Sequence, residues 1–349
     1  MTGFFNRIGR LIKGSGTQRK LAPTAPGGSV VAVRPRCLDP GESERGFYLS
    51  LFEAHSHRSG TGLEQTAQPL SVPQRLVVDV VRKNLAETGT KTLVVPRLPS
   101  VIPRLLQSLR DQDASVRDFV GIINKDPAMS AAVLKLANSA YFNPISHRDT
   151  SIERAVVKLG IEGLRSVLSA AVLLPVIQCR TPYFGRFGFK LWQHCLCCAV
   201  TCELIAKKRG LEPFKAYILG LTHDIGKIAL FSELGRQFQL NAMDDKPGRN
   251  AFIPLLMEQS ARLSSRIART WELPAEVCEA LSEQENINQN TALMVSPYGQ
   301  LLYHANLVCE SYARVNVGEL QKRIALKLLD EFSVPDNIYS LLEQLPLEL

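Results

Sequence analysis

The sequence predicts an all-α protein. Apolar residues recur at three- and four-residue intervals, as over residues 101–109, and this is the period of one helix face. Helix signals divide the pattern: Asp126-Pro127 places a capping carboxylate before a proline, and Gly160 and Gly210 each follow an apolar run. No alternating apolar and polar stretch of useful length and no β-hairpin signal occurs, so no sheet is expected.

Composition sets the broad class. The chain has 349 residues, of which 45% are apolar, and this is enough to bury a large core. No run of eighteen apolar residues and no secretory signal is found, so we expect a cytoplasmic protein. The net charge is +8, but residues 1–36 hold seven of the 41 basic residues and no acidic one, leaving 34 basic and 33 acidic residues. The main domain therefore gives no reason to expect nucleic acid.

The first 94 residues are predicted to be an extension. Residues 1–42 form a basic arm that we expect to be largely disordered, since 14–42 are rich in Gly, Ser, Thr and Pro. Residues 3–13 have the pattern of a short basic amphipathic helix, which allows weak membrane-surface contact or a frayed terminus. Residues 43–94 read as accessory helices that dock on the main domain. Their second helix begins near Pro73 and carries an apolar stripe that includes Leu76 and Val80.

The main domain is predicted over residues 95–310, in two helical halves, 95–185 and 186–310. In the first half, Asp126-Pro127 begins a helix, Ser151 caps the next, Gly160 ends it, and residues 161–178 form another. The helices expected in the second half, and in the C-terminal segment 311–349, follow helical periodicity at 190–209, 214–222, 251–271, 274–285, 292–312, 317–332 and 336–344.

Eight cysteines are present, and four of them cluster in the helix at 190–209. Cys195, Cys198 and Cys202 fall at i, i+3 and i+7, which is one helix face and not the turn-linked CxxC pair of a zinc site. Free cysteine behaves as a small apolar residue, so buried packing in a reducing compartment is the favoured interpretation. Zinc binding is the alternative.

A histidine–aspartate pair is the strongest chemical signal. His223 and Asp224 follow the apolar run 214–222 and precede Gly226-Lys227, and His194 lies one helix upstream. Imidazole and carboxylate groups are ligands of divalent cations, so these three residues can begin a metal site. Lys227 could bind a phosphate, although a solvated cation at the end of a helix is the plainer interpretation.

Two sets of residues carry a resemblance to a known family. The first set includes Asp126-Pro127-Ala128 and Leu136-Ala137-Asn138-Ser139; the second includes Trp192-Gln193-His194, the stretch 220–227 and Trp271-Glu272-Leu273-Pro274. Together they resemble the HDOD domain, a relative of the HD metal-dependent phosphohydrolases, over roughly residues 95–310. The resemblance implies an all-helical domain with an HD-like C-terminal half, a role in bacterial signalling, and no HD catalysis.

The resemblance also implies a ligand set against which this chain can be compared. HD hydrolases hold metal with a first histidine, a His-Asp pair and a late aspartate, and His194, His223 and Asp224 match the first three. Spacing places Asn306 where the late aspartate would stand, and places Ser260 and Glu283-Gln284 where further histidines are common. Glu283 could still bind a cation, whereas His304 would point elsewhere on its helix.

We therefore expect a non-catalytic signalling protein with a degenerate metal site that acts through signalling-protein partners or a small ligand, such as a nucleotide or second messenger. No cofactor is expected in this interpretation. The alternative is a phosphohydrolase that uses a divalent metal on nucleotides or cyclic dinucleotides.

Overall fold

The computed structural model describes most of the predicted main domain and parts of the extension. The described residues are 30–33, 71–86, 120, 123, 127–139, 142–143, 151–177, 187–240, 253–287, 292–332 and 334–345. The first of the two accessory helices expected within residues 43–94 and the amphipathic segment 3–13 lie outside them. The described part is helical throughout apart from one small sheet, so the all-α prediction is confirmed.

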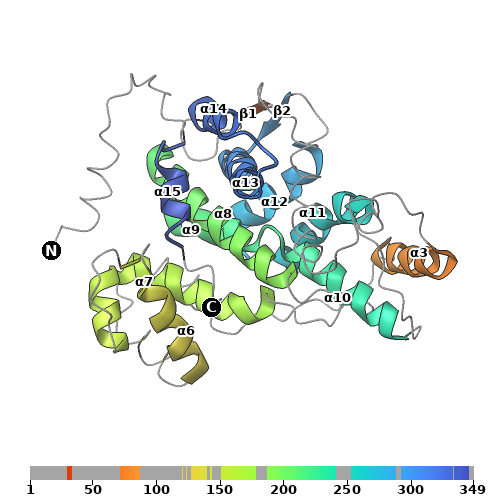
Figure 1. Ribbon diagram of the computed structural model, residues 1–349, viewed down its shortest axis with the longest axis horizontal. Coiled ribbons are helices and arrows are strands. Elements are labelled where there is room, and N and C mark those ends of the chain that lie inside the picture. Colours follow the sequence, from red (N-terminus) through yellow and green to blue (C-terminus); the bar gives the residue numbers. More distant parts are fainter. Residues whose placement is uncertain are drawn as a thin grey trace.

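Helices α8 (Phe187–Arg209) and α9 (Pro213–Thr222) form the centre of the molecule (Figure 1). Gly210, with φ of +70°, ends α8, as the sequence predicts. The side chain of Glu212 then accepts hydrogen bonds from the amides of Phe214 and Lys215, and caps α9. The two helices therefore pack as a tight hairpin.

The hairpin depends on a small residue at position 220. An added Cβ at Gly220 would lie 2.6–2.7 Å from backbone atoms of Cys198 and Ala199 in α8. This close approach brings the end of α9, and the His-Asp pair that follows it, against the face of α8 that carries His194.

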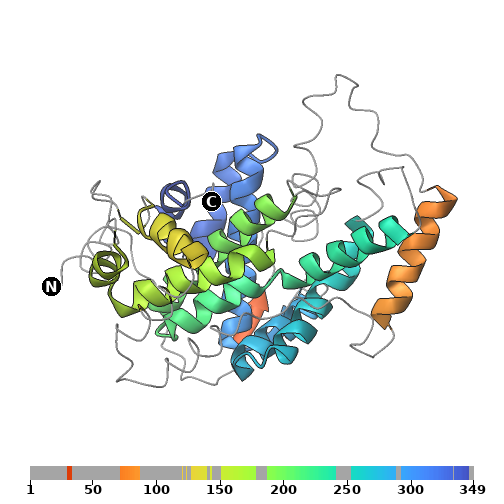
Figure 2. The same ribbon diagram turned by 90° about the horizontal axis from the view of Figure 1, so that it is seen from below.

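The N-terminal half of the domain packs at one end of this centre. It contains α6 (Pro127–Ala137) and α7 (Ile152–Ile177), which lie side by side in Figures 1 and 2. Gly160 has φ of +68° and interrupts α7, so the region consists of two helices joined at the glycine predicted to separate them.

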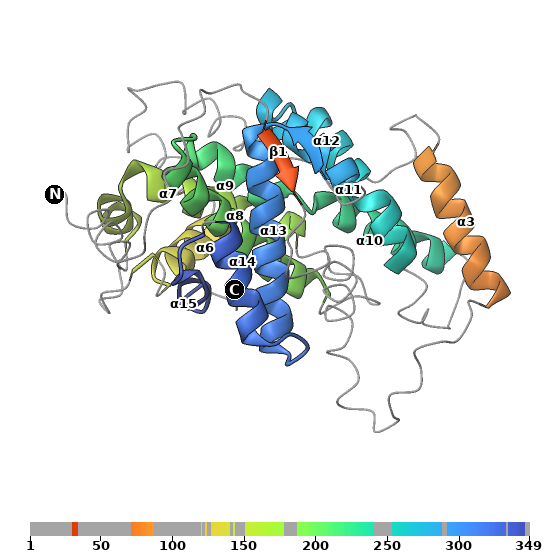
Figure 3. The same ribbon diagram turned by 90° about the horizontal axis from the view of Figure 1, so that it is seen from above.

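On the other side, α10 (Ile225–Leu240) and α11 (Ile253–Thr270) extend away from the centre, and α12 (Ala275–Ile287) packs against α11, α13 and α9. No helix was expected over residues 225–240. Figure 3 shows α3 (Val72–Ala86) against the far part of α10. The predicted apolar stripe of α3 is partly wrong: Leu76 and Val80 are 61% and 42% exposed, and Val78 is buried in their place.

The C-terminal helices and a small sheet complete the fold. Helix α13 (Pro297–Asn316) packs on α8, α14 (Lys322–Phe332) packs on α13, and α15 (Ile338–Leu342) lies near α8. Strand β1 (Val30–Val33) pairs antiparallel with β2 (Ala292–Val295), and Val30 faces Val295 in the register.

This pairing corrects two expectations. Residues 30–33 belong to the arm predicted to be disordered, and residues 292–295 to a predicted helix. A four-residue pair is too short to show a clear alternating pattern, and its two strands are distant in sequence, so no hairpin signal accompanies it.

The cysteines of α8 lie in the core. Cys195, Cys197, Cys198 and Cys202 are free thiols that are at most 5% exposed, as the packing interpretation expects. Within the described ranges, no helix combines the length and apolar character that a membrane crossing requires.

Replacing Gly220 by alanine is expected to lower the free energy of unfolding by about 2 kcal/mol, because the new methyl group meets the backbone of α8, which cannot rotate away. Chemical denaturation measures the change, and alanine at the exposed Lys322 serves as the control. Equal stability of the two variants would show that the hairpin does not need this close approach.

Candidate functional site

Three helices and one turn bring the candidate residues together. His194 lies on α8, His223 and Asp224 form the turn between α9 and α10, and Asn306 lies on α13. The amide of Gly226 donates a hydrogen bond of 3.0 Å to the Oγ of Ser264 on α11, which holds the start of α10. The sequence-predicted pair and the upstream histidine therefore meet in space.

The distances within this group are short. Nε2 of His194 lies 3.3 Å from Nε2 of His223. Oδ2 of Asp224 lies 3.3 Å from Nε2 of His223 and 3.6 Å from Nε2 of His194. All three side chains are buried, so two imidazoles and one carboxylate converge away from solvent.

The protonation of His223 follows from its contacts. Its Nδ1 lies 2.7 Å from the carbonyl oxygen of Gly220. A carbonyl only accepts hydrogen bonds, so Nδ1 carries the proton and Nε2 presents a lone pair to His194 and Asp224. Burial lowers the pKa of His223, which keeps the ring neutral.

Burial also controls His194. It lowers the pKa of His194 to about 3, although the charge of Asp224 acts in the opposite direction. The ring is therefore neutral at physiological pH. Its Nε2 lies 3.0 Å from Oδ1 of Asn306. With His223 also neutral, the site contains two uncharged imidazoles, which is the form in which histidine binds metals.

Asn306 stands where spacing placed the late ligand. Its Nδ2 donates a hydrogen bond of 3.0 Å to Oε1 of Glu310, and this fixes Oδ1 toward His194. Glu310 is 1% exposed, and sequence reasoning did not find it. The spacing of four residues between Asn306 and Glu310 could have predicted it, because this spacing places both side chains on one face of α13.

Lys227 is not the solvated cation that the sequence favoured. It is 3% exposed, and its Nζ lies 2.7 Å from Oδ2 of Asp224. Burial alone would raise the pKa of Asp224, but His223, Lys227 and His194 outweigh it and lower the pKa to about 2. The carboxylate is therefore ionised and paired, because lysine follows the aspartate by three residues on one helical turn.

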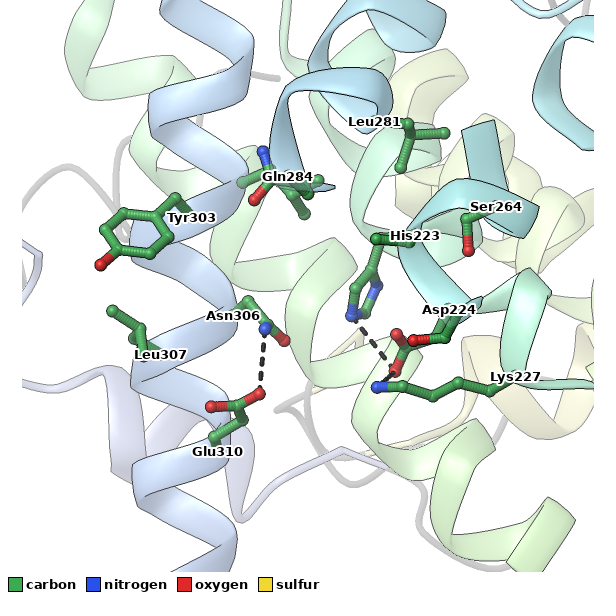
Figure 4. A pocket seen from close by; sticks show the side chains of 13 residues that line it. His223, Asp224, Lys227, Ser264, Leu281, Gln284, Tyr303, Asn306, Leu307 and Glu310 are labelled. Carbon is green, nitrogen blue, oxygen red and sulfur yellow. Dashed lines mark hydrogen bonds and ion pairs between the residues drawn. The ribbon is translucent and has the colours of Figure 1, made fainter. Parts of the chain in front are cut away.

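A small pocket opens beside this group (Figure 4). In Figure 4, His223 and Lys227 point toward Asp224 on one side, and Asn306 and Glu310 of α13 face them. The residues that line it are His223, Asp224, Lys227, Ser260, Ala261, Ser264, Leu281, Gln284, Leu302, Tyr303, Asn306, Leu307 and Glu310. The cavity volume of about 50 Å³ accommodates a few water molecules or a small polar group.

The other sequence candidates take different places. Ser260 and Gln284 line the pocket, as neutral side chains. Glu283, considered as a cation ligand, is instead bound to Ser296 at the start of α13, where its carboxylate accepts from the amide and the hydroxyl at 2.8 Å each. His304 points elsewhere, as expected: its Nδ1 lies 2.9 Å from Nη2 of Arg209, and its ring stacks on Phe332.

The residues present fit a borderline or soft cation better than a hard one. Magnesium and calcium prefer several oxygen ligands, whereas this group offers two imidazole nitrogens and one carboxylate. The thiol of Cys198 adds a sulfur, with Sγ 3.6 Å from Nε2 of His194. Among the described residues, His194, Cys198 and His223 form one group with ligand-atom separations within 4.8 Å, and Cys195, His223 and Asp224 form another.

Comparison with known proteins shows which protein family and which relatives this chain is similar to. The sequence model of the HDOD domain matches residues 95–287, which is more than half of the chain. An uncharacterised protein of Treponema pallidum (strain Nichols) is 24% identical over 232 residues, which cover 64% of this chain and 44% of that protein. The matched part is thus less than half the length of that relative.

Solved structures show the same fold. An HDOD domain protein of unknown function from Geobacter sulfurreducens matches with a TM-score of 0.53 at 19% identity, covering 79% of this chain and 99% of that one. A proposed metal-dependent phosphohydrolase from Shewanella amazonensis SB2B matches with a TM-score of 0.56 at 19% identity, covering 78% and 99%. At this identity the likeness concerns the fold alone.

Replacing Lys227 by methionine is expected to destabilise the protein by about 3–5 kcal/mol, because Asp224 would remain buried without its cation. The double variant K227M/D224N is expected to recover most of this loss. Denaturation in the presence of a chelator measures the cycle. If the changes in the free energy of unfolding caused by K227M and D224N simply add in the double variant, the two side chains do not stabilise each other.

Stability is expected to fall as the pH drops below about 6.5, because buried histidines are held neutral in the folded state. Burial, and secondarily Arg209, lowers the pKa of His304, so the unfolded chain binds this proton first. Replacing His304 by glutamine is expected to make the slope between pH 6.5 and 4 shallower by up to about 1.4 kcal/mol per pH unit. Urea denaturation at several pH values tests this, and parallel slopes for the two proteins would contradict it.

Proposed function

The chain belongs to the HDOD domain family, and from this premise we propose that it is a non-catalytic regulatory protein of bacterial signalling. It acts by binding a protein partner or a small ligand. The pocket beside His223 and Asp224 is the ligand site in this proposal.

Asn306 is the observation that carries the proposal. HD hydrolases close their metal site with an aspartate at this position, and the charge of that aspartate helps to hold a catalytic cation. Here a neutral amide occupies the position, and both of its polar ends are engaged, with His194 and Glu310. Ser260 and Gln284 line the pocket where further imidazoles would be needed for a second cation.

The character of the pocket favours a small polar ligand. Lys227 and Ser260 carry hydrogen-bond donors, and Asp224 and Glu310 carry carboxylate acceptors, so donors and acceptors line one cavity. Its volume of about 50 Å³ suits an inserted polar group rather than a whole nucleotide. Perturbed pKa values next to a concavity are typical of ligand sites.

Phosphohydrolase activity is the second candidate function, and one observation favours it. His194, His223 and Asp224 approach one another within 3.3–3.6 Å, as ligands of a single cation would. A catalytic cation needs, in addition, an open position for water and a charge balance that a late carboxylate normally supplies.

We expect the purified protein, supplied with Mn²⁺, Zn²⁺ or Mg²⁺, to hydrolyse neither nitrophenyl phosphodiesters nor cyclic dinucleotides above the rate of the Asp224→Ala variant. The physical reason is the neutral side chain at position 306. Product analysis by chromatography measures the rates, and Asn306→Asp tests whether a carboxylate alone restores turnover. Wild-type turnover that disappears in Asp224→Ala would establish the phosphohydrolase instead.

A further inference from the structure

We propose that Cys198 is a metal ligand, and that His194, Cys198, His223 and Asp224 together bind one thiophilic cation of the zinc class. The cysteine adds a sulfur ligand to a site otherwise built from imidazole and carboxylate. This inference deepens the proposed function, since it concerns the group beside the same pocket, and it names what the buried part of that site binds.

Four of the six separations among these ligand atoms match the edges of a tetrahedral site. Cys198 and Asp224 belong to two separate close groups that share His223, so their side chains must approach each other when the ion binds. Zinc lies about 2.0–2.1 Å from nitrogen and about 2.3 Å from sulfur, so tetrahedral neighbours lie about 3.3 Å apart between two nitrogens and about 3.6 Å apart between nitrogen and sulfur. The two Nε2 atoms are 3.3 Å apart, and Sγ of Cys198 is 3.6 Å from Nε2 of His194. Oδ2 of Asp224 lies 3.3 and 3.6 Å from the same two nitrogens.

The helix explains why the thiol is in place. Cys198 follows His194 by four residues on α8, so both side chains project from one face toward His223. The residue is 0% exposed, and α8 is held against α9 by the close contact at Gly220. A ligand on a rigid, buried helix loses little conformational freedom when it binds.

The second shell also has the form of a metal site. Metal-binding histidines usually donate their other ring N–H to a carbonyl or carboxylate, and Nδ1 of His223 donates to the carbonyl of Gly220. Lys227 donates to Oδ2 of Asp224 at 2.7 Å, which supports the carboxylate without occupying the imidazoles. Two of the four ligands are therefore already oriented.

The polar atoms of the group converge on one point. Oδ1 of Asn306, Nε2 of His223 and Oδ2 of Asp224 face Nε2 of His194 at 3.0, 3.3 and 3.6 Å. A cation between them would accept lone pairs from the imidazoles and the carboxylate together.

Binding releases one proton. The Cys198 thiol loses its proton to solvent and binds as thiolate, and both imidazoles bind through the lone pair of Nε2. Four protein ligands then surround the ion, and no position stays open for water. Closed tetrahedral sites of this kind are structural rather than catalytic, in agreement with the proposed non-catalytic function.

Cobalt substitution tests the ligand directly. The full-length protein is stripped with a chelator and titrated with Co²⁺, and absorption spectra are recorded before and after Zn²⁺ is added. We expect one equivalent to bind, with the visible bands of tetrahedral Co²⁺ and a near-ultraviolet thiolate-to-cobalt charge-transfer band, all displaced by Zn²⁺. Metal content by mass spectrometry gives the stoichiometry.

Three serine variants assign the sulfur. Cys198→Ser is expected to lose the charge-transfer band and to weaken Zn²⁺ binding by more than the roughly 10–100-fold that loss of an outer-shell partner costs. Cys202→Ser, a buried thiol one turn further along the same face, is the matched control and should retain both. Cys195→Ser is included because this thiol belongs to the overlapping group with His223 and Asp224.

Several outcomes would overturn the proposal. If the wild-type protein binds no Co²⁺, or binds it without a charge-transfer band, a thiolate ligand is excluded. This result does not require any variant to fold. If Cys195→Ser loses the charge-transfer band and Cys198→Ser keeps it, the sulfur ligand is Cys195, and the assignment to Cys198 is wrong. Circular dichroism confirms that Cys198→Ser is folded, and Cys198→Ala replaces it if it is not.

The two proposals fail separately. A missing thiolate band with no phosphodiester turnover removes the metal proposal and leaves the non-catalytic function standing. Turnover by a protein that shows the thiolate band removes the non-catalytic function and keeps the ligand assignment.

Discussion

The buried carboxylate of Asp224 is the constraint on which this part of the structure depends. An ionised group in a protein interior is costly unless it is paired and hydrogen-bonded, and Asp224 is 5% exposed. Lys227 supplies the opposite charge from the next helical turn, and the two imidazoles face the same oxygen. The turn between α9 and α10 therefore cannot shift without breaking contacts to α8. The fit of α9 against α8 at Gly220 and the position of the carboxylate are two parts of one arrangement.

This constraint extends across the domain through single contacts. His194 connects the carboxylate to α8, Asn306 connects His194 to α13, and Ser264 connects the start of α10 to α11. Four helices, α8, α10, α11 and α13, thus meet at one buried polar group. Such a group specifies how the helices are placed, because each member has a partner only in this arrangement.

The sequence could predict the parts that depend on local signals. Glycines at positions 160 and 210 ended helices where expected, since a positive φ is a property of the single residue. The ligand spacing implied by the resemblance to HD hydrolases placed Asn306 at the late ligand position, and its Oδ1 lies beside His194. The sheet was missed because the pairing of 30–33 with 292–295 is set by tertiary contact. The burial of Lys227 could not be predicted, because a charged residue after a glycine gives no local sign that its environment is buried.

Two residues next to the predicted group share one reason why the sequence does not place them there. Cys198 and Glu310 each follow a recognised residue by four positions, but the pattern favours apolar packing for the cysteine, with zinc binding as the alternative, and gives no separate signal for the glutamate. Helical spacing states which side chains share a face, but burial decides whether a thiol beside an imidazole is packing or a ligand. Here Sγ of Cys198 lies within 3.6 Å of Nε2 of His194 and 3.8 Å of Oδ1 of Asn306. In the proposed zinc site, a neutral amide stands where HD hydrolases carry an aspartate and a thiol joins the two imidazoles, so a soft ligand is present and a hard one is absent. Such an exchange would alter which cation the site can hold, and four protein ligands would leave no open position of the kind that hydrolysis requires.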